Sequence, residues 1–334
     1  MSTSSNSTTK PTIGLNRVFH PALQPILEEK YNILLSPNFD YSTDICSTLE
    51  GLLVHGHTKI NQELLQKFPN LKIISNHGVG IDHINVPDCT AKGVIVGNTP
   101  DVLTEATADM ALALLLSVAR KVVEGDAISR HPSTTNFNPY WFGREVYGST
   151  VGIIGMGRIG QAIARRCALG FNCTIVYHNR TPVSKQIETL LNNATYYASI
   201  LAMVPLCDYV VLAAPATPET YHLLKTEHFA AMKPHSYFIN ISRGTLVDQD
   251  SLIYALHNGP LEGAGLDVTD PEPLPRDHPL LACKNCIITP HTGSATYQTR
   301  QAMLELAIDN LTNGLQNKVL IASPNQHEVL KNKK

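Results

Sequence analysis

Three residues that could bind an anion and transfer a proton each follow a segment predicted to be a buried strand. Arg243 follows YFINIS, Glu272 follows GAGLDV and His291 follows CIITP. Open α/β sheets bind ligands at the carboxyl ends of their strands. An arginine binds carboxylates in a fork, a histidine supplies a proton near neutral pH, and a neighbouring carboxylate orients the imidazole. Alternatively, these residues are a surface ion-pair partner, a solvated loop acid and a helix cap.

A glycine-rich turn stands between another apolar run and a helix-like segment, in VGIIGMGRIGQAIARRC at 151–167. Its glycines have GxGxxG spacing, which permits a tight turn, approach of a pyrophosphate to the backbone, and close packing of helix on strand. We expect a dinucleotide-binding turn; the alternative is a turn that only requires glycine. The cofactor contacts predicted in this turn are Gly155, Met156, Gly157, Arg158, Ile159 and Gly160.

The end of the next strand bears on which nucleotide is bound. NAD-binding enzymes usually carry an acid about twenty residues after the turn, which accepts a hydrogen bond from the ribose 2′-hydroxyl. The segment 172–182, NCTIVYHNRTP, has no acid and offers Asn179 and Arg180 instead. Because Arg180 can bind a 2′-phosphate through charge-assisted hydrogen bonds, the sequence predicts NADPH, with NADH less favoured. Otherwise Arg180 is a solvated surface charge.

Strand-like and helix-like segments alternate along the chain, which indicates parallel strands joined by crossover helices. The expected strands begin at Ile33, Gly51, Leu71, Val94, Val151, Thr174, Asp208, Ser236, Gly263 and Cys286. We predict an α/β protein of two doubly wound parallel-sheet domains with an active-site cleft between them. Residues 13–102 and 295–325 form a substrate domain, residues 103–294 a Rossmann dinucleotide-binding domain, and residues 1–12 a disordered lead.

Two long helices and one long loop complete the expected organisation. Residues 104–120 are rich in helix formers and apolar almost all round, which predicts a helix buried between the domains. A second helix at 295–315 precedes a polar, Lys-rich tail. The loop 129–148 is expected to expose more aromatic surface than a monomer would tolerate, which predicts a homodimer interface. These aromatic residues are Phe137, Tyr140, Trp141 and Phe142.

Five segments of the chain resemble the D-isomer-specific 2-hydroxyacid dehydrogenase family. They are SNHGVGIDHINV, VGIIGMGRIGQAIARR, NISRGTLVDQDSLIYAL, GAGLDVTDPEPLP and ITPHTGSAT. The resemblance extends from about Leu52 to Asn313 and is greatest to the glyoxylate/hydroxypyruvate reductase branch. It implies that Arg243, Glu272 and His291 are catalytic.

The same resemblance implies further contacts. Val79 and Gly80, in HGVGIDH, would bind the substrate carboxylate through a nest of backbone amides, unless this is an ordinary turn. Asp267 would lie near the nicotinamide, or alternatively cap a neighbouring turn. Gly293 would contact the cofactor. Ser294 would contact the substrate, as would two of the catalytic residues, Arg243 and His291.

The expected activity is NADPH-dependent reduction of a small 2-oxo acid to a D-2-hydroxy acid by hydride transfer. Glyoxylate, hydroxypyruvate or a related sugar acid would be the substrate. One alternative is a 2-ketogluconate reductase. Another is a nucleotide-sensing, corepressor-like binding protein of the same fold, which would not turn over hydroxypyruvate.

Composition excludes several other classes of partner. The 26 basic and 28 acidic residues give a net charge of −2, so neither nucleic acid nor a membrane surface is expected to bind. An odd number of cysteines, 7, and the lack of an apolar leader in residues 1–12 favour the cytoplasm. No metal is expected, because the histidines lack accompanying carboxylates and the CxxC pair lacks further ligands. These residues are His55, His57, His77, His83, Cys283 and Cys286.

Overall fold

The computed structural model describes residues 10–56, 58–136 and 138–332, which form two compact units. The first unit comprises residues 1–103 and 296–334, and the second comprises residues 104–295. The predicted lead lies outside the described residues except for its last three. Of these, Pro11 accepts a backbone hydrogen bond from Asn32, at 2.9 Å, and Thr12 begins the first strand.

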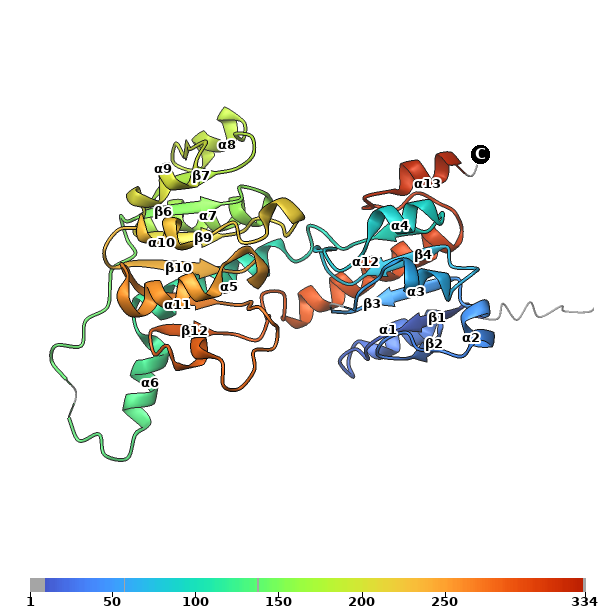
Figure 1. The fold of residues 1–334 in the computed structure, drawn as a ribbon, viewed down its shortest axis with the longest axis horizontal. Coiled ribbons are helices and arrows are strands. Elements are labelled where there is room, and N and C mark those ends of the chain that lie inside the picture. Colours follow the sequence, from blue (N-terminus) through green and yellow to red (C-terminus); the bar gives the residue numbers. More distant parts are fainter. Residues whose placement is uncertain (1–9, 57, 137, 333–334) are drawn as a thin grey trace, which may run out of the picture. The chain divides into compact units, whose positions relative to one another are not determined.

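The first unit is built on a parallel five-stranded sheet with the order β2-β1-β3-β4-β5 (Figure 1). This is a doubly wound order, in which the chain turns back to the opposite side of β1 after β2. Its strands are β1 (Thr12–Leu15), β2 (Asn32–Leu35), β3 (Gly51–Val54), β4 (Ile73–Asn76) and β5 (Ile95–Gly97). Its helices are α1 (Gln24–Lys30), α2 (Thr43–Thr48), α3 (Gln62–Gln66), α4 (Val86–Ala91), α12 (Tyr297–Leu315) and α13 (Gln326–Asn332).

Alternation of side chains along these strands gives the first unit a hydrophobic cluster on each face of its sheet. On β4, Ile73 packs with residues of α1 and α12, whereas its neighbour Ile74 packs with residues of α2, α3 and α4. Such strands, buried on both faces, have continuous apolar sequences instead of alternating ones. For this reason the apolar runs at 33, 51, 71 and 94 were informative, while the short segment TIGL at 12–15 was missed.

The residues after α12 do not form a simple polar tail. Leu320 and Val329 are buried, and the side chain of Asn325 accepts a hydrogen bond from the backbone N–H of Val96, at 2.9 Å. These contacts hold the segment and α13 against β5 and the rest of the first unit. A few apolar residues suffice to anchor this largely polar segment.

The second unit contains a parallel seven-stranded sheet with the order β12-β11-β10-β9-β6-β7-β8. The chain starts at β6, adds β7 and β8 on one side, and then returns to add β9 to β12 on the other. Its strands are β6 (Thr150–Ile154), β7 (Thr174–His178), β8 (Thr195–Tyr196), β9 (Tyr209–Leu212), β10 (Ser236–Asn240), β11 (Leu261–Leu266) and β12 (Cys286–Ile288). The order reverses between β6 and β9, and that point is where a doubly wound sheet binds a dinucleotide.

Helices cover both faces of this sheet. One hydrophobic cluster joins α5 and α7 to it, and another joins α9, α10 and α11. The α helices are α5 (Thr104–Ala119), α6 (Val122–Arg130), α7 (Arg158–Phe171), α8 (Lys185–Leu190), α9 (Ile200–Met203), α10 (Thr226–Ala230) and α11 (Gln249–Asn258). The 3₁₀ turns are η1 (Val204–Leu206), η2 (Pro218–Thr220), η3 (Gly244–Leu246) and η4 (Pro279–Ala282).

Helix α5 has the apolar character that suggested burial between domains. Its buried residues pack within the second unit, against β10, β11 and α7. The all-round apolarity therefore reflects contact with both a sheet and a helix of the same unit.

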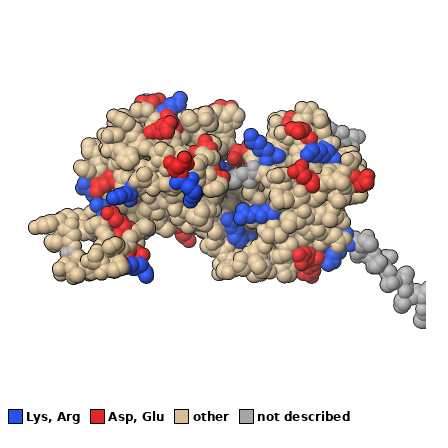
Figure 2. All heavy atoms as spheres, turned by 60° about the horizontal axis from the view of Figure 1, so that its bottom comes forward, with Lys and Arg blue, Asp and Glu red and all other residues tan. Residues whose placement is uncertain are grey.

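Surface features agree with the balanced charge. On the face drawn in Figure 2, acidic and basic side chains are interspersed over each unit. No helix among the described residues is long and apolar enough to cross a membrane.

Candidate active site

The glycine turn joins β6 to α7, and its three glycines differ in what surrounds the position of a side chain. Gly155 has φ +98°, and a Cβ there would lie 2.6 Å from the backbone nitrogen of Ala214. A Cβ at Gly160 would lie 2.1 Å from the carbonyl oxygen of Gly155, so helix and turn touch directly. Gly157, in contrast, has no atom within 4 Å of the Cβ position. The backbone is therefore tightly packed at Gly155 and Gly160. At Gly157, beside the N-terminus of α7, it leaves the space that a pyrophosphate requires.

The other predicted residues of the turn take different positions. Met156 is buried in the cluster under α5 and α7, which leaves its backbone as the part that can face a ligand. Its carbonyl oxygen accepts a hydrogen bond from the side chain of Gln161, at 3.1 Å. Arg158, at the start of α7, is exposed, and Ile159 is half-buried.

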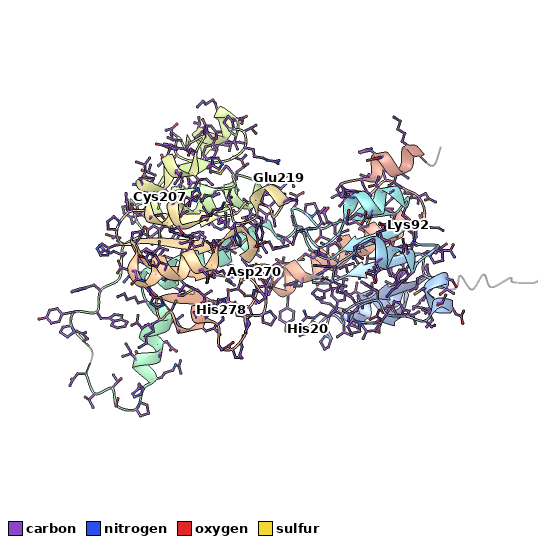
Figure 3. All side chains as sticks on the ribbon, viewed as in Figure 1. His20, Lys92, Cys207, Glu219, Asp270 and His278 are labelled. Carbon is purple, nitrogen blue, oxygen red and sulfur yellow. The ribbon has the colours of Figure 1, made fainter. Side chains whose placement is uncertain are left out.

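The loops after β7 and β9 flank this turn, because both strands pair with β6. Asn179 and Arg180 lie in the first loop, and Arg180 is exposed. Glu219 lies in the second (Figure 3). The pKa of Glu219 is lowered by a hydrogen bond from Thr217, then by its own backbone, with a further contribution from the charge of Arg180. Glu219 is thus an acid of a neighbouring loop, and Arg180 makes the last of the contributions to its lowered pKa.

His291 and Glu272 form a hydrogen-bonded pair in the second unit. The imidazole Nδ1 lies 2.7 Å from the Glu272 carboxylate oxygen Oε1, and the two side chains are 30% and 28% exposed. A carboxylate only accepts hydrogen bonds, so the ring donates from Nδ1 and its Nε2 is the nitrogen remote from the acid. His291 has φ 54°, a left-handed conformation that is uncommon outside glycine and concentrates at functional sites.

Asp267, at the end of β11, organises the turn that carries His291. Its backbone carbonyl accepts from the N–H of His291 at 2.9 Å. One carboxylate oxygen accepts from the hydroxyl of Thr289 at 2.6 Å and the N–H of Thr292 at 2.8 Å, and the other accepts from the N–H of Gly293 at 2.7 Å. The side chain is 2% exposed. The structure thus gives Asp267 the turn-capping role that the sequence left as an alternative. Ser294 follows in the same turn and is half-buried.

Arg243 lies in the turn after β10, where its own backbone is held by the preceding strand. Its carbonyl accepts from the side-chain amide of Asn240 at 2.9 Å, and its Nη1 donates to the carbonyl of Ser242 at 2.8 Å. A Cβ on Gly244 would lie 2.0 Å from the carbonyl carbon of Thr269. The turn that carries Arg243 therefore lies against the loop that leads from β11 to Glu272.

Val79 and Gly80 follow β4 in the first unit. The side-chain amide of Asn76 donates to the carbonyls of Gly78 and Gly80, at 3.0 and 2.9 Å, and that of Asn98 donates to the carbonyl of Val79, at 3.0 Å. These bonds hold the three carbonyls of the segment in place. None of residues 78–80 has a positive φ, so the segment lacks the right-handed and left-handed alternation that forms an anion-binding nest.

Comparison with known proteins decides the family. The profile described as D-isomer specific 2-hydroxyacid dehydrogenase, NAD binding domain, matches residues 112–293. The chain belongs to the D-isomer-specific 2-hydroxyacid dehydrogenase family. It is an NAD(P)-dependent dehydrogenase. The family predicted from the sequence is confirmed, and the two parallel sheets confirm the predicted doubly wound α/β class.

Relatives of this dehydrogenase include named reductases. Glyoxylate/hydroxypyruvate reductase B of Escherichia coli K12 is 40% identical over 324 residues, which cover 95% of this chain and 99% of the reductase. The enzyme of the same name from Citrobacter koseri is 41% identical over 316 residues, covering 93% and 96%. The NADPH-dependent glyoxylate/hydroxypyruvate reductase of Sinorhizobium meliloti, solved with NADP and malonate, is similar with a TM-score of 0.84 at 32% identity, covering 95% of this chain and 98% of that one.

Other histidines and cysteines of the dehydrogenase are packed as core or surface groups. In the first unit His55 stacks on Phe19 with ring centroids 4.8 Å apart, and His77 lies 4.9 Å from His55. His83 lies 3.1 Å from the side-chain oxygen of Asn76, and His57 is outside the described residues. No group of three or more His, Cys, Asp or Glu side chains in the described part of the chain is placed to hold a metal ion.

The CxxC pair of the dehydrogenase lies where η4 leads into β12, whose first residue is Cys286. The Sγ of Cys283 lies 3.4 Å from Nε2 of His257, and burial raises the pKa of both Cys283 and Cys286. Raised pKa values keep thiols protonated and weakly nucleophilic. We assign no chemistry to the pair.

Sequence reasoning missed residues that position the predicted ones. Asn76 and Asn98 hold the glycine segment, and the only sequence signal was an asparagine immediately before HGVG and another in GNTP. Glu219 belongs to a loop that is remote in sequence from Arg180. Tyr177 and Glu188, which contact each other at 2.8 Å next to the loop of Arg180, resemble ordinary strand and helix residues in the sequence.

Proposed function

We propose that this dehydrogenase reduces small 2-oxo acids, such as glyoxylate and hydroxypyruvate, to D-2-hydroxy acids with NADPH. The hydrogen bond of 2.7 Å between His291 and Glu272 carries the proposal. A histidine oriented by a carboxylate is a group that can hold and deliver a proton near neutral pH. The names of the reductases of Escherichia coli and Citrobacter koseri support the substrate class.

In this proposal, His291 gives a proton from Nε2 to the oxygen that develops negative charge as the carbonyl is reduced. Glu272 orients the ring through Nδ1 and stabilises the imidazolium before the proton leaves. Arg243 binds the substrate carboxylate and polarises the carbonyl, because its guanidinium presents several donors in a fixed fork. Val79, Gly80 and Ser294 are further substrate contacts. When bound, NADPH supplies the hydride.

The proposed cofactor contacts start from the glycine turn, which fits a dinucleotide because it leaves open space at Gly157 beside the N-terminus of α7. Here the helix N–H groups without intrahelical partners attract the pyrophosphate. Asn179 and Arg180 bind the 2′-phosphate. Gly293 and Asp267 contact the nicotinamide end, Asp267 chiefly by holding the turn.

NADPH preference is supported by Arg180 and by the NADP complex of the Sinorhizobium meliloti relative. We expect Arg180→Asp to reverse or erase the preference, measured as the ratio of kcat/KM for NADPH and NADH. A wild-type enzyme that favours NADH would refute the assignment of Arg180.

Turnover of a panel of acids tests the activity. The purified protein is mixed with NADPH or NADH and with glyoxylate, hydroxypyruvate, pyruvate or 2-ketogluconate, and oxidation of the nicotinamide is followed by absorbance. We expect the highest kcat/KM with glyoxylate or hydroxypyruvate and NADPH. Highest turnover with 2-ketogluconate would identify the larger sugar acid as the substrate, and no turnover with any of the four would contradict the proposed reaction.

A further inference from the structure

The loop that carries Arg180 is closed by a hydrogen-bonded pair beneath it. The hydroxyl of Tyr177 accepts a hydrogen bond from the backbone N–H of Val183, at 3.0 Å, and donates one to Oε1 of Glu188, at 2.8 Å. The second carboxylate oxygen of Glu188 lies 2.6 Å from Nζ of Lys185. The loop 178–183 is therefore attached to Tyr177 at both ends. It begins at the end of the tyrosine's own strand, and at Val183 it is hydrogen-bonded to the tyrosine hydroxyl.

Both members of the pair are buried, which distinguishes them from an ordinary surface contact. Tyr177 is 0% exposed and Glu188 is 5% exposed. Burying a carboxylate is costly unless it is paired, and an apolar side chain of similar size would pack in the same place without that cost. Hydrogen bonds from Lys185 and then Tyr177 lower the pKa of Glu188 and keep it ionised, so it remains a strong acceptor. The carboxylate therefore meets the buried tyrosine on one side and the exposed Lys185 on the other.

Two further contacts restrain the loop from the side of β8. The hydroxyl of Tyr196 donates to the carbonyl of Asn179 at 3.3 Å, and Nδ1 of His178 donates to the carbonyl of Tyr197 at 2.9 Å. Each acts on residues before Arg180, whereas the Tyr177 hydroxyl acts on the residue where the loop enters α8. Within the loop, the side-chain amide of Asn179 also donates to the carbonyl of Thr181, at 3.0 Å. The Tyr177 hydroxyl joins the end of β7 to Val183, at the far end of the loop.

We propose that Tyr177 and Glu188 are positioning residues for cofactor discrimination: they hold the loop 178–183 so that Arg180 is presented to the 2′-phosphate. This rests on the proposed function, in which Arg180 binds that phosphate. A guanidinium on a loop held in one conformation loses less freedom on binding, so the preordered loop favours NADP⁺ without adding a contact. NAD⁺ lacks the phosphate and gains nothing from it.

Binding of NADP⁺ and NAD⁺ to the full chain, measured by calorimetry, tests the proposal without turnover. We expect Tyr177→Phe to weaken NADP⁺ about fivefold, the effect of losing one ordinary hydrogen bond, and to change NAD⁺ little. The matched control is Tyr209→Phe. Tyr209 is also buried in this unit and donates to a carbonyl, that of Glu145, at 3.1 Å, but it lies at the opposite end of the sheet from the Arg180 loop. An equal loss of NADP⁺ affinity in both variants would overturn the proposal.

Variants of Glu188 test whether the acceptor of the tyrosine hydroxyl matters. Glu188→Leu puts an apolar side chain in its place and leaves the hydroxyl without that acceptor, so the melting temperature and NADP⁺ affinity should both fall while NAD⁺ affinity changes little. Glu188→Gln keeps an acceptor for the tyrosine and should stay near the wild-type affinity. These variants also serve if Tyr177→Phe does not fold. Unchanged NADP⁺ affinity in Glu188→Leu would contradict the role of the pair.

A double-mutant cycle with Arg180→Ala distinguishes the two proposals. If the pair acts through Arg180, Tyr177→Phe should have no effect on NADP⁺ affinity in the Arg180→Ala background. An Arg180→Ala variant that binds NADP⁺ as tightly as wild type would overturn both the assignment of Arg180 and the positioning role. If Arg180→Ala weakens NADP⁺ but Tyr177→Phe does not, only the positioning role fails.

Discussion

Gly244 and Thr269 touch so closely that no side chain fits between them. A Cβ on Gly244 would lie 2.0 Å from the carbonyl carbon of Thr269 and 2.2 Å from its oxygen. Both atoms belong to backbone, which cannot swing away as a flexible side chain can. Gly244 therefore allows the turn that carries Arg243 to pack on the loop before Glu272.

We expect Gly244→Ala to displace Arg243 and lower kcat/KM by about 100-fold, because small misplacements of catalytic groups are costly. Substrate kinetics and thermal unfolding measure the effect. The control is Gly170→Ala in α7, where no atom lies within 4 Å of the new Cβ. That change should leave kinetics unchanged and stabilise the fold by about 0.4–1 kcal/mol. Wild-type kcat/KM in Gly244→Ala would show that Arg243 does not depend on this contact.

His291→Ala should lower kcat by about 10²–10⁴, the range for loss of a positioned general acid, and leave NADP⁺ affinity nearly intact. Glu272→Gln keeps a hydrogen-bond acceptor but no charge, so it should lower kcat less than His291→Ala does. Steady-state kinetics and calorimetry provide both values. Full turnover in His291→Ala would remove the residue from the mechanism.

Arg243→Ala should raise KM for the 2-oxo acid and lower kcat together. The reason is that its charge-assisted contact would serve the bound carboxylate and the developing alkoxide alike. Arg276 offers a matched control, because it is exposed and its side chain donates to the carbonyl of Leu274, at 2.7 Å. Arg276→Ala should leave both constants unchanged. A change in melting temperature alone would make Arg243 structural.

The first unit should lose stability in acid because of the buried His77 and the half-buried His55. Burial, with the charges of Arg300 and Arg17, lowers the pKa of His55 to about 4, and burial, with His55 and Arg300, lowers that of His77 to about 3. Unfolded histidines bind protons near pH 6.5, so the unfolded state takes up more protons below that pH. The stabilising effect is therefore complete above about pH 6.5 and is lost as the pH falls toward the two lowered values.

Urea unfolding between neutral and acid pH measures this loss, and His77→Gln should make the dependence shallower. Gln retains a donor for the carbonyl of Arg300, which lies 3.4 Å from Nε2 of His77. Nuclear magnetic resonance of the imidazoles checks the cause directly. Signals of His55 and His77 that titrate near pH 6.5 would contradict it.

The segment between α6 and β6 should form a homodimer interface. Tyr140 is 79% and Phe142 70% exposed, and Trp141 beside them lies 5.5 Å from Nζ of Lys121. Phe137 lies outside the described residues. Consecutive exposed aromatic residues indicate a surface that a partner covers. Light scattering at micromolar concentration should give twice the chain mass, and a Tyr140→Ser, Phe142→Ser variant should give the monomer; a monomeric wild type would rule the dimer out.

The sequence by itself determined those features that depend on local sterics and on strand ends. The three glycines of 155–160 are required by contacts within a single strand–turn–helix segment, so their spacing was sufficient to locate the turn. Arg243, Glu272 and His291 each follow a strand of one parallel sheet, and parallel strands end at one edge. Motif order and strand pattern therefore predicted them before any contact was known.

Only the tertiary structure decided which groups act on these residues. Two hydrogen bonds join segments whose sequence separation follows no local rule: that of Tyr177 with Glu188, and that of Asn98 with the carbonyl of Val79. Their side chains look like ordinary strand, turn and loop residues because hydrogen-bond partners are selected by distance in space. Helix periodicity and strand alternation specify which face a residue occupies, but the packing of whole elements determines what it meets there.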